Sequence, residues 1–342
     1  MWYTGRMRKW MLIALLVAIG GYLTYKSEVL NPKIQKGSSS QIPNQEKQTD
    51  QPGETVNPYS IAMLRKRPYD GGKIATVRQA AQTTRFTSYV VTYTSDGLVQ
   101  YALMNVPKGQ VPEGGWPVVI VNHGHITPEE YSTEKSYINT SAYFANAGFL
   151  VLKPDFRGHG NSEGQAERIV SRVLYAVDVL NLLAAIPTQT SANAEKIYMY
   201  GHSMGGDVTL RVLEVSDNVR AATLWAPAVS DWPESMLHFS RRNRNRPERL
   251  PTLEAELKEN FKPEEYSGIS TLDNTQLVKS PVNIQHATTD QSVPFEWGER
   301  LADKLKSEGA TVNFFRYPGD NHDIAGNWST ALNRDIELFR GN

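Results

Sequence analysis

The stretch that decides the fold covers residues 196–206 and reads KIYMYGHSMGG. Its apolar first half predicts a buried strand, and the glycines around Ser203 predict a sharp turn into a following helix. Larger side chains beside the serine would collide at such a turn, and the new helix directs its backbone N–H groups back at it. The sequence therefore predicts a strand–turn–helix unit that carries an exposed serine.

Short apolar strands alternate with helical segments on both sides of this unit. Further strands are expected at 86–96, 98–107, 117–124, 149–158, 219–228, 282–290 and 312–318, and helices at 135–147 and 166–186. The first two strands are joined at Asp96-Gly97, which is a hairpin signal. Continuous apolar strands that alternate with helices indicate an α/β fold, with a mostly parallel central sheet covered by helices on both faces.

Between residues 229 and 280 the alternation breaks. This segment is polar and charged, and it carries five neighbouring arginines: Arg241, Arg242, Arg244, Arg246 and Arg249. An insertion after the strand at 219–228 would lie over the carboxyl ends of the strands, where open α/β sheets bind ligands. We therefore expect a helical, lid-like insertion; the alternative is a solvated helical excursion with a basic surface patch.

Composition excludes several classes of function. Among the 342 residues, 36 Lys and Arg balance 36 Asp and Glu, which argues against a nucleic-acid partner. Cysteine is absent, so disulfides, thiolate metal sites and cysteine nucleophiles are excluded. His123 and His125 stand two residues apart without a nearby carboxylate, which is a weak metal signal. We expect neither a metal nor another cofactor.

The N-terminus predicts a membrane tether. Arg6, Arg8 and Lys9 precede an uncharged, largely apolar stretch at 10–25, which would span about 24 Å as a helix at ~1.5 Å per residue. We expect 1–30 to be an uncleaved signal anchor, 31–57 a flexible linker and 58–342 the catalytic domain on the extracytoplasmic side. The alternatives are a signal peptide whose cleavage gives a secreted protein, and a chance apolar start to a cytosolic one.

A serine nucleophile needs a base, and the base needs an orienting acid. Asp290 follows a predicted strand in HATTDQSVP, and His322 follows the last one in YPGDNHDI. Ser203, Asp290 and His322 therefore follow the ends of predicted parallel strands and can converge on one edge of the sheet. Three further carboxylates are rival acids: Asp155, Asp320 and Asp323. The last is too close to His322 in sequence to orient it easily, and the first precedes the serine.

Two backbone amides are predicted to bind the negative oxygen that forms during attack. The amide of Met204 starts the helix after Ser203, and the amide of His125 lies in the loop after the strand at 117–124. The glycine-rich loop at 155–164 does not have the spacing or the lysine of a phosphate-binding loop. We expect it to be a structural loop beside the site, with Asp155 and Arg157 held in local hydrogen bonds.

Together these motifs resemble the catalytic domain of the prolyl oligopeptidase family of serine peptidases, over roughly residues 110–342. The resemblance rests on five short motifs: HG at 123–124, D-x-R-G-x-G-x-S-x-G at 155–164, GHSMGG at 201–206, D-x-x-V-P at 290–294 and G-x-x-H at 319–322. It implies an α/β-hydrolase fold, with Ser203 as nucleophile, Asp290 as acid and His322 as base. It also implies hydrolysis of short peptides, or of acyl esters as in esterase-like relatives.

The chain departs from the family pattern in two places. Only about 60 residues separate the linker from the strand at 117, which leaves no room there for the family's usual β-propeller. Where many members carry a tyrosine in the oxyanion loop, Asn122 stands near that position. A serine peptidase and a carboxylesterase are both compatible with these features. A catalytically silent binding module is the third possibility, although such proteins normally lack one triad residue.

Overall fold

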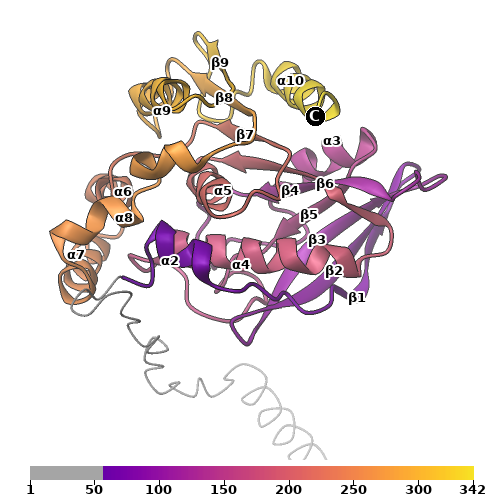
Figure 1. The fold of residues 1–342 in the computed structure, drawn as a ribbon, viewed down its shortest axis with the longest axis horizontal. Coiled ribbons are helices and arrows are strands. Elements are labelled where there is room, and N and C mark those ends of the chain that lie inside the picture. Colours follow the sequence, from indigo (N-terminus) through magenta and orange to yellow (C-terminus); the bar gives the residue numbers. More distant parts are fainter. Residues whose placement is uncertain (1–56) are drawn as a thin grey trace, which may run out of the picture. The chain divides into compact units, whose positions relative to one another are not determined.

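A nine-stranded sheet forms the centre of the computed structural model, which describes residues 57–342 (Figure 1). Its strands are β1 (Ala75–Gln82), β2 (Phe86–Ser95), β3 (Leu98–Pro107), β4 (Trp116–Asn122), β5 (Leu150–Pro154), β6 (Ala192–His202), β7 (Ala221–Trp225), β8 (Val282–Ala287) and β9 (Val312–Tyr317). In space the order is β1-β2-β3-β5-β4-β6-β7-β8-β9. The pairs β1-β2, β2-β3 and β3-β5 are antiparallel. All the other neighbouring pairs, from β5-β4 to β8-β9, are parallel. The prediction of a mostly parallel sheet is confirmed.

Helices cover both faces of this sheet. They are α2 (Ile61–Lys66), α3 (Ile138–Asn146), α4 (Ser171–Ala185), α5 (Met204–Val215), α6 (Glu234–Arg242), α7 (Arg249–Asn260), α8 (Tyr266–Ile269), α9 (Phe295–Ser307) and α10 (Trp328–Arg340). Short 3-10 turns occupy Ile186–Thr188, Pro263–Glu265 and Leu272–Leu277. Buried side chains of α2, α4, α5 and α9 share one core, and those of α3 and α10 share the other. The sheet therefore lies between two helical layers, as expected.

The first parallel strand along the chain, β4, shows why a buried strand is a continuous apolar run. Val118 and Ile120 pack into the core under α4 and α5, whereas Val119 and Val121 pack into the core under α3 and α10. All four side chains are fully buried. A strand whose two faces are both covered gains no advantage from alternating polar residues, so the run stays apolar.

The apolar helix α4 was expected at 166–186 and begins a few residues later. With the turn after it, the segment Ser171–Thr188 is long and apolar enough to cross a membrane, but 78% of it is buried inside the protein. It is therefore a buried core helix that packs on the central sheet. The predicted anchor and nearly all of the predicted linker lie outside the described residues, so the domain limits stay a prediction.

Strand β1 was not predicted. It forms the edge of the sheet beside β2, and nearly all of its residues are exposed on both faces.

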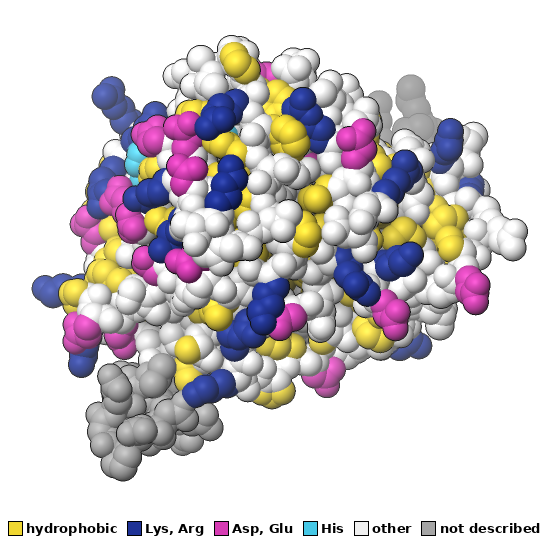
Figure 2. All heavy atoms as spheres, turned by 45° about the horizontal axis from the view of Figure 1, so that its top comes forward, with side chains coloured by type: hydrophobic (Ala, Val, Ile, Leu, Met, Phe, Trp, Pro, Cys, Tyr) yellow, Lys and Arg dark blue, Asp and Glu magenta, His cyan; other side chains and the backbone are white. Residues whose placement is uncertain are grey.

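The molecular surface in Figure 2 shows basic and acidic side chains interspersed with small apolar areas, and neither sign of charge dominates the face in this view. This distribution agrees with the balanced composition of the chain.

Candidate active site

Ser203 occupies the turn between β6 and α5 in a backbone conformation that non-glycine residues rarely adopt. Its φ is 54° and its ψ is −116°. The turn is held by the end of β7, because Ser203 N donates to the carbonyl of Trp225 (2.8 Å) and its own carbonyl accepts from Ala228 N (3.0 Å). The serine is thus fixed at the carboxyl edge of the sheet.

The glycines around this serine are required by close packing. A Cβ on Gly205 would overlap the backbone carbonyl oxygens of Asn122 and His123 at the end of β4. A Cβ on Gly201 would overlap the carbonyl of Gly205. The turn therefore brings β6, α5 and the end of β4 together more closely than any side chain would permit, which explains the spacing of the motif.

Asp290 and His322 meet at the same edge. The Oδ2 atom of Asp290, after β8, lies 2.7 Å from Nδ1 of His322, after β9. The other carboxylate oxygen, Oδ1, accepts hydrogen bonds from the amides of Ser292 (2.7 Å) and Val293 (3.0 Å). Burial raises the pKa of Asp290, but hydrogen bonds from His286, His322 and Ser292 outweigh it and hold the pKa well below its usual range. The carboxylate is therefore ionised. It binds Nδ1 of His322, and the other ring nitrogen, Nε2, faces away from the acid.

The three rival acids are engaged elsewhere. Asp155 accepts hydrogen bonds from Tyr131 (2.6 Å) and Thr133. Asp320 caps the chain ahead of α10, where it accepts from the amides of Gly326 and Asn327 (3.0 Å each). Asp323 is largely exposed, at 72% of its side chain. Of the aspartates weighed from the sequence, Asp290 is the one bonded to the ring of His322.

His202, the residue before Ser203, links the serine turn to the loop of His322. Its Nε2 donates to the carbonyl of His322 (3.2 Å), and the two rings lie 4.7 Å apart. Burial, followed by the charge of His322, lowers the pKa of His202 to about 4, so this ring is neutral near pH 7. The loop that carries His322 is thus bonded to the residue that precedes Ser203.

Tyr137 is a residue at the site that the sequence did not reveal. It precedes α3 in a left-handed conformation, with φ at 54°. Its hydroxyl accepts a hydrogen bond from Gly124 N (2.9 Å) and bonds to Nδ1 of His202. Asn122, in contrast, is buried and donates to Thr209 (2.8 Å). A tyrosine hydroxyl therefore does reach the loop after β4, but from the residue just before α3, and no motif around Tyr137 could have shown this.

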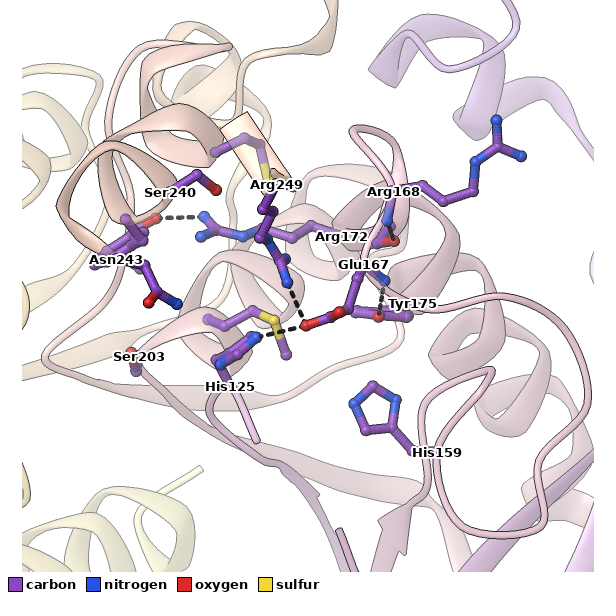
Figure 3. Close-up of a pocket in the computed structure, with 15 residues that line it drawn as sticks. His125, His159, Glu167, Arg168, Arg172, Tyr175, Ser203, Ser240, Asn243 and Arg249 are labelled. Atoms are coloured by element: carbon purple, nitrogen blue, oxygen red, sulfur yellow. Dashed lines mark hydrogen bonds and ion pairs between the residues drawn. The ribbon is translucent and has the colours of Figure 1, made fainter. Parts of the chain in front are cut away.

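A cavity of about 150 Å³ adjoins the serine (Figure 3). Ser203, Met204 and His125, three of the predicted site residues, line it. Its apolar wall includes Ala228, Met236 and Phe239, and its polar wall includes Arg172, Glu167 and Arg249. Helices α6 and α7 of the predicted insertion thus supply part of the wall, and the lid-like role of this segment stays a prediction.

Glu167 ties this insertion to the loops of the site. It accepts hydrogen bonds from Arg246 (2.6 Å), just ahead of α7, and from Arg249, the first residue of α7. Its Oε1 lies 3.3 Å from Nε2 of His125. Burial raises the pKa of Glu167, but the hydrogen bonds and charges of Arg246 and Arg249 more than offset it, so the pKa is lowered. This carboxylate is the central acceptor between the insertion and the loop that carries His125.

The glycine-rich loop at 155–164 has the structural character expected of it. Arg157 donates to Asp178 on α4 (2.9 Å), and both side chains are buried. His123 stacks on Phe156 at 4.2 Å, and burial holds the pKa of this histidine well below its usual range. Within residues 57–342 no group of three or more His, Cys, Asp or Glu side chains is placed to hold a metal ion. The polar groups under the site thus support its loops.

The comparison with known proteins agrees with this geometry. A family model described as the prolyl oligopeptidase family matches residues 135–338. The "Probable dipeptidyl peptidase 4" of Aspergillus flavus is 25% identical over 217 residues, which cover 61% of this chain and 27% of that protein. Protein ABHD12B of Homo sapiens is 25% identical over 197 residues, or 55% of this chain and 49% of that protein. The chain therefore matches half or less of the length of these relatives.

A solved structure with a similar fold is acetyl xylan esterase 1 from Thermoanaerobacterium sp. JW/SL YS485. It has a TM-score of 0.62 and 17% identity, and the match covers 84% of this chain and 96% of that one. At this identity the likeness establishes the fold alone. The fold is that of the α/β-hydrolases, which agrees with the sheet order and with the serine turn.

Proposed function

The chain belongs to the prolyl oligopeptidase family of serine hydrolases, and on this premise we propose that it cleaves peptide or acyl-ester bonds through an acyl-enzyme. The observation that carries the proposal is the 2.7 Å contact of Asp290 with His322, in a loop that bonds to the residue before Ser203, a serine held in a strained turn. Such an arrangement has little structural purpose. It is what a nucleophilic serine needs.

In the proposed reaction Ser203 Oγ attacks the substrate carbonyl carbon while Nε2 of His322 takes the hydroxyl proton. Asp290 accepts from Nδ1 of His322, which fixes the tautomer that leaves Nε2 able to act as a base. The protonated His322 then gives its proton to the leaving nitrogen or oxygen, and the acyl group stays on the serine. Water attacks the acyl-enzyme by the same route, which releases the acid and restores Ser203.

The backbone amides of Met204 and His125 are the proposed donors to the developing oxyanion. The first belongs to the start of α5, whose N-terminal amides favour negative charge. The second follows Gly124, whose own amide is occupied by Tyr137. Preorganised donors of this kind typically contribute ~10²–10³-fold to the rate.

Peptidase and carboxylesterase activity use the same machinery and differ in the leaving group. The family match supports peptide substrates, and we propose these first. The cavity of about 150 Å³ beside Ser203 supports a short acyl group, which an esterase of small acyl chains would also accept. Comparing kcat/KM on aminoacyl amides and matched acyl esters separates the two. Because esters are intrinsically easier to cleave, only clear turnover of the amide supports a peptidase.

A fluorophosphonate probe tests the proposal directly, because it labels activated serines. We expect rapid labelling of the wild-type protein and none of Ser203→Ala, with His322→Gln labelled far more slowly. The exposed Ser307 at the end of α9 offers a matched control, and Ser307→Ala should be labelled like the wild type. Equal labelling of Ser203→Ala, or no labelling of the folded wild type, would reject the enzyme and favour a binding module.

We also propose that the catalytic domain is tethered on the extracytoplasmic side of a membrane. The support is the sequence: three basic residues precede an apolar stretch at 10–25, and a polar segment at 31–57 follows it. Membrane fractionation together with sequencing of the mature N-terminus tests this. A mature chain that begins after residue 20 would instead show cleavage and secretion.

A further inference from the structure

We infer that the acyl group of the substrate carries a carboxylate, and that Arg172 binds it at the inner wall of the cavity beside Ser203. The inference rests on the proposed function and names the substrate class for that same site. The carboxylate source is either an acidic residue whose carbonyl is attacked or the far end of a dicarboxylic half-ester. These share one chemistry: a short chain with a carbonyl at one end and an anion at the other.

Arg172 is a buried arginine with unused donors. It lies near the start of α4, lines the cavity, and only 8% of its side chain is exposed. All of its hydrogen bonds within the described chain run through Nη1, to the carbonyl of Ala228 (2.9 Å) and to Asp207 (3.5 Å). Nε and Nη2, which form one edge of the guanidinium, have no partner among residues 57–342. A carboxylate accepts two parallel hydrogen bonds from such an edge.

The charge around Arg172 is incompletely balanced. Its partner Asp207 stands at the limit of hydrogen-bonding distance and also accepts a hydrogen bond from Thr271 (2.6 Å). Burial lowers the pKa of Arg172 by disfavouring its charge, and the carboxylate of Asp207 only partly offsets this. A largely buried guanidinium whose carboxylate partner is long and shared can gain a second carboxylate from a ligand at its free edge.

Arg249, which lines the cavity, and Arg246, which shares its carboxylate partner, add further positive charge. Arg246 and Arg249 share the single carboxylate of Glu167. Glu248 also approaches Arg246 (3.6 Å), but its side chain is 68% exposed, so water screens it. Arg168, the remaining lining arginine, is paired with Glu256 at 3.3 Å and points away from the cavity in Figure 3. The surplus of positive charge favours entry of an anion.

The apolar wall of the cavity determines what can join the reactive carbonyl of the substrate to its carboxylate. Met204, Ala228, Met236 and Phe239 line the cavity next to Ser203, and the ring of Phe239 lies 5.8 Å from the Arg172 guanidinium carbon. A few methylene groups would pack on this wall while the carboxylate reaches Arg172. The cavity of about 150 Å³ has room for such a short chain. The cavity therefore fits a glutamyl side chain or a glutaryl group.

Two pairs of isosteric substrates test the inference. One pair is the p-nitroanilides of glutamate and glutamine; the other is 4-nitrophenyl glutarate as the free acid and as its methyl ester. We expect kcat/KM of the wild type to favour the anionic member of at least one pair about tenfold or more. A preference in the anilide pair identifies a peptide source and one in the ester pair alone a half-ester. Equal rates, or a preference for both neutral members, overturn the inference.

Variants at position 172 separate recognition from structural support. We expect Arg172→Met to lose the anion preference, measured as the ratio of kcat/KM for the anionic member of a pair to kcat/KM for its neutral member. Arg172→Lys, which keeps the charge without the two-pronged edge, should retain part of the preference. Arg241→Met is the matched control, because Arg241 is half-exposed on α6, pairs with Glu234 and does not line the cavity. A folded Arg172→Met variant that keeps the preference, or that loses both substrates equally, overturns the inference.

A binding measurement keeps this test independent of turnover. Glutaramate and the neutral diamide glutaramide are titrated calorimetrically into Ser203→Ala, and Arg172→Met in the same background serves as the second sample. Glutaramate that binds at least tenfold tighter than glutaramide, with the difference lost in the double variant, supports the inference even if the rates are low. If the fluorophosphonate probe labels Ser203 but no anion preference is found in rates or binding, only the inference fails.

Discussion

Nε2 of His286 lies 3.1 Å from Oδ2 of Asp290, the same oxygen that bonds His322. The aspartate therefore accepts from two imidazoles on one oxygen and from two backbone amides on the other. His286 is fully buried at the end of β8, and its ring packs directly against Gly298 of α9. This histidine holds the carboxylate of Asp290 in place and is not among the residues that line the cavity beside Ser203.

We expect His286→Leu to lower kcat about tenfold while KM stays nearly constant. The variant removes one donor from the Asp290 carboxylate, and hydrogen bonds to charged groups contribute ~1.5–3 kcal/mol. The pKa of Asp290 should rise, and the orientation of His322 should loosen. Steady-state kinetics check this, with His238→Leu on the outer insertion as the control. An unchanged kcat in a folded His286→Leu variant would show that the amides of Ser292 and Val293 suffice.

Tyr137→Phe removes the hydroxyl that accepts from Gly124 N and bonds to His202. We expect kcat to fall about tenfold, which corresponds to ~1.4 kcal/mol, because the loop before His125 loses its anchor. The melting temperature should change little, since the ring itself remains. Tyr143→Phe on the same helix is the matched control, because its hydroxyl bonds only to the far side, at Asn333 and Ser329. Equal kinetics of both variants would contradict the role assigned to Tyr137.

Glu167→Gln should loosen the insertion that covers the cavity. The substitution removes the charge that Arg246 and Arg249 share, so we expect faster amide hydrogen exchange across 243–260 and a KM altered about threefold. Glu248→Gln, at an exposed partner of Arg246, should leave exchange unchanged.

The pH dependence of this contact follows from the lowered pKa of Glu167. A carboxylate whose pKa is depressed on folding contributes stability above its unfolded pKa, and that stability is lost as the pH falls through the folded value. The protection factors of 243–260 in the wild type, which correct for the intrinsic pH dependence of amide exchange, should therefore be constant from pH 6 to 8 and should fall only in acid. A fall in protection between pH 6 and 8 would point to another group.

Asp335 makes stability depend on pH in the opposite sense. Burial raises the pKa of this carboxyl to about 7, although Thr223 (2.7 Å) and Trp225 (2.8 Å) donate to it. Because the folded state holds the proton more tightly, the contribution is fully present below the unfolded pKa near 4 and is lost as the pH rises towards 7. We expect Tm to decline over this range, and Asp335→Asn to flatten the decline. Asp303→Asn, at an exposed position, should leave the slope as it is.

The sequence predicted the strands with two covered faces because burial leaves a continuous apolar run. In β4 and β6 that run is unmistakable, and the polar residue after each such strand end is automatically a candidate for the site. Strand β1 could not be found this way, because ATVRQAAQ is held by pairing with β2 while its side chains stay in solvent. Its stability comes from backbone hydrogen bonds, which leave no periodic pattern of side chains.

Some residues of the site could be predicted from the sequence and others could not, for a similar reason. Asp290 and His322 could be predicted because strand ends in a parallel sheet share an edge, so their order along the chain sufficed. His286 lies inside its strand, and Tyr137 reaches the site from another helix. Glu167 meets Arg249 across 82 positions of the chain. Contacts of this kind depend on side-chain directions and on how loops cross in space, which spacing alone does not encode.

Ser203→Gly should be inactive and yet more stable than the wild type. A residue other than glycine at this φ and ψ carries ~1–3 kcal/mol of backbone strain, which glycine would largely relieve. Glycine's larger unfolded-state entropy offsets part of this gain. We expect a higher urea midpoint for Ser203→Gly than for Ser203→Ala, and the same midpoint for both would show that the turn is unstrained.

The strain at the serine turn places residue 203 under two opposing selective pressures. Folding alone would favour glycine at position 203, whereas acyl transfer requires the hydroxyl. A lineage released from the need for hydrolysis would therefore be expected to drift quickly to glycine there, with the neighbouring glycines unchanged. Such a replacement would mark the loss of the enzyme in a descendant long before the fold itself decayed.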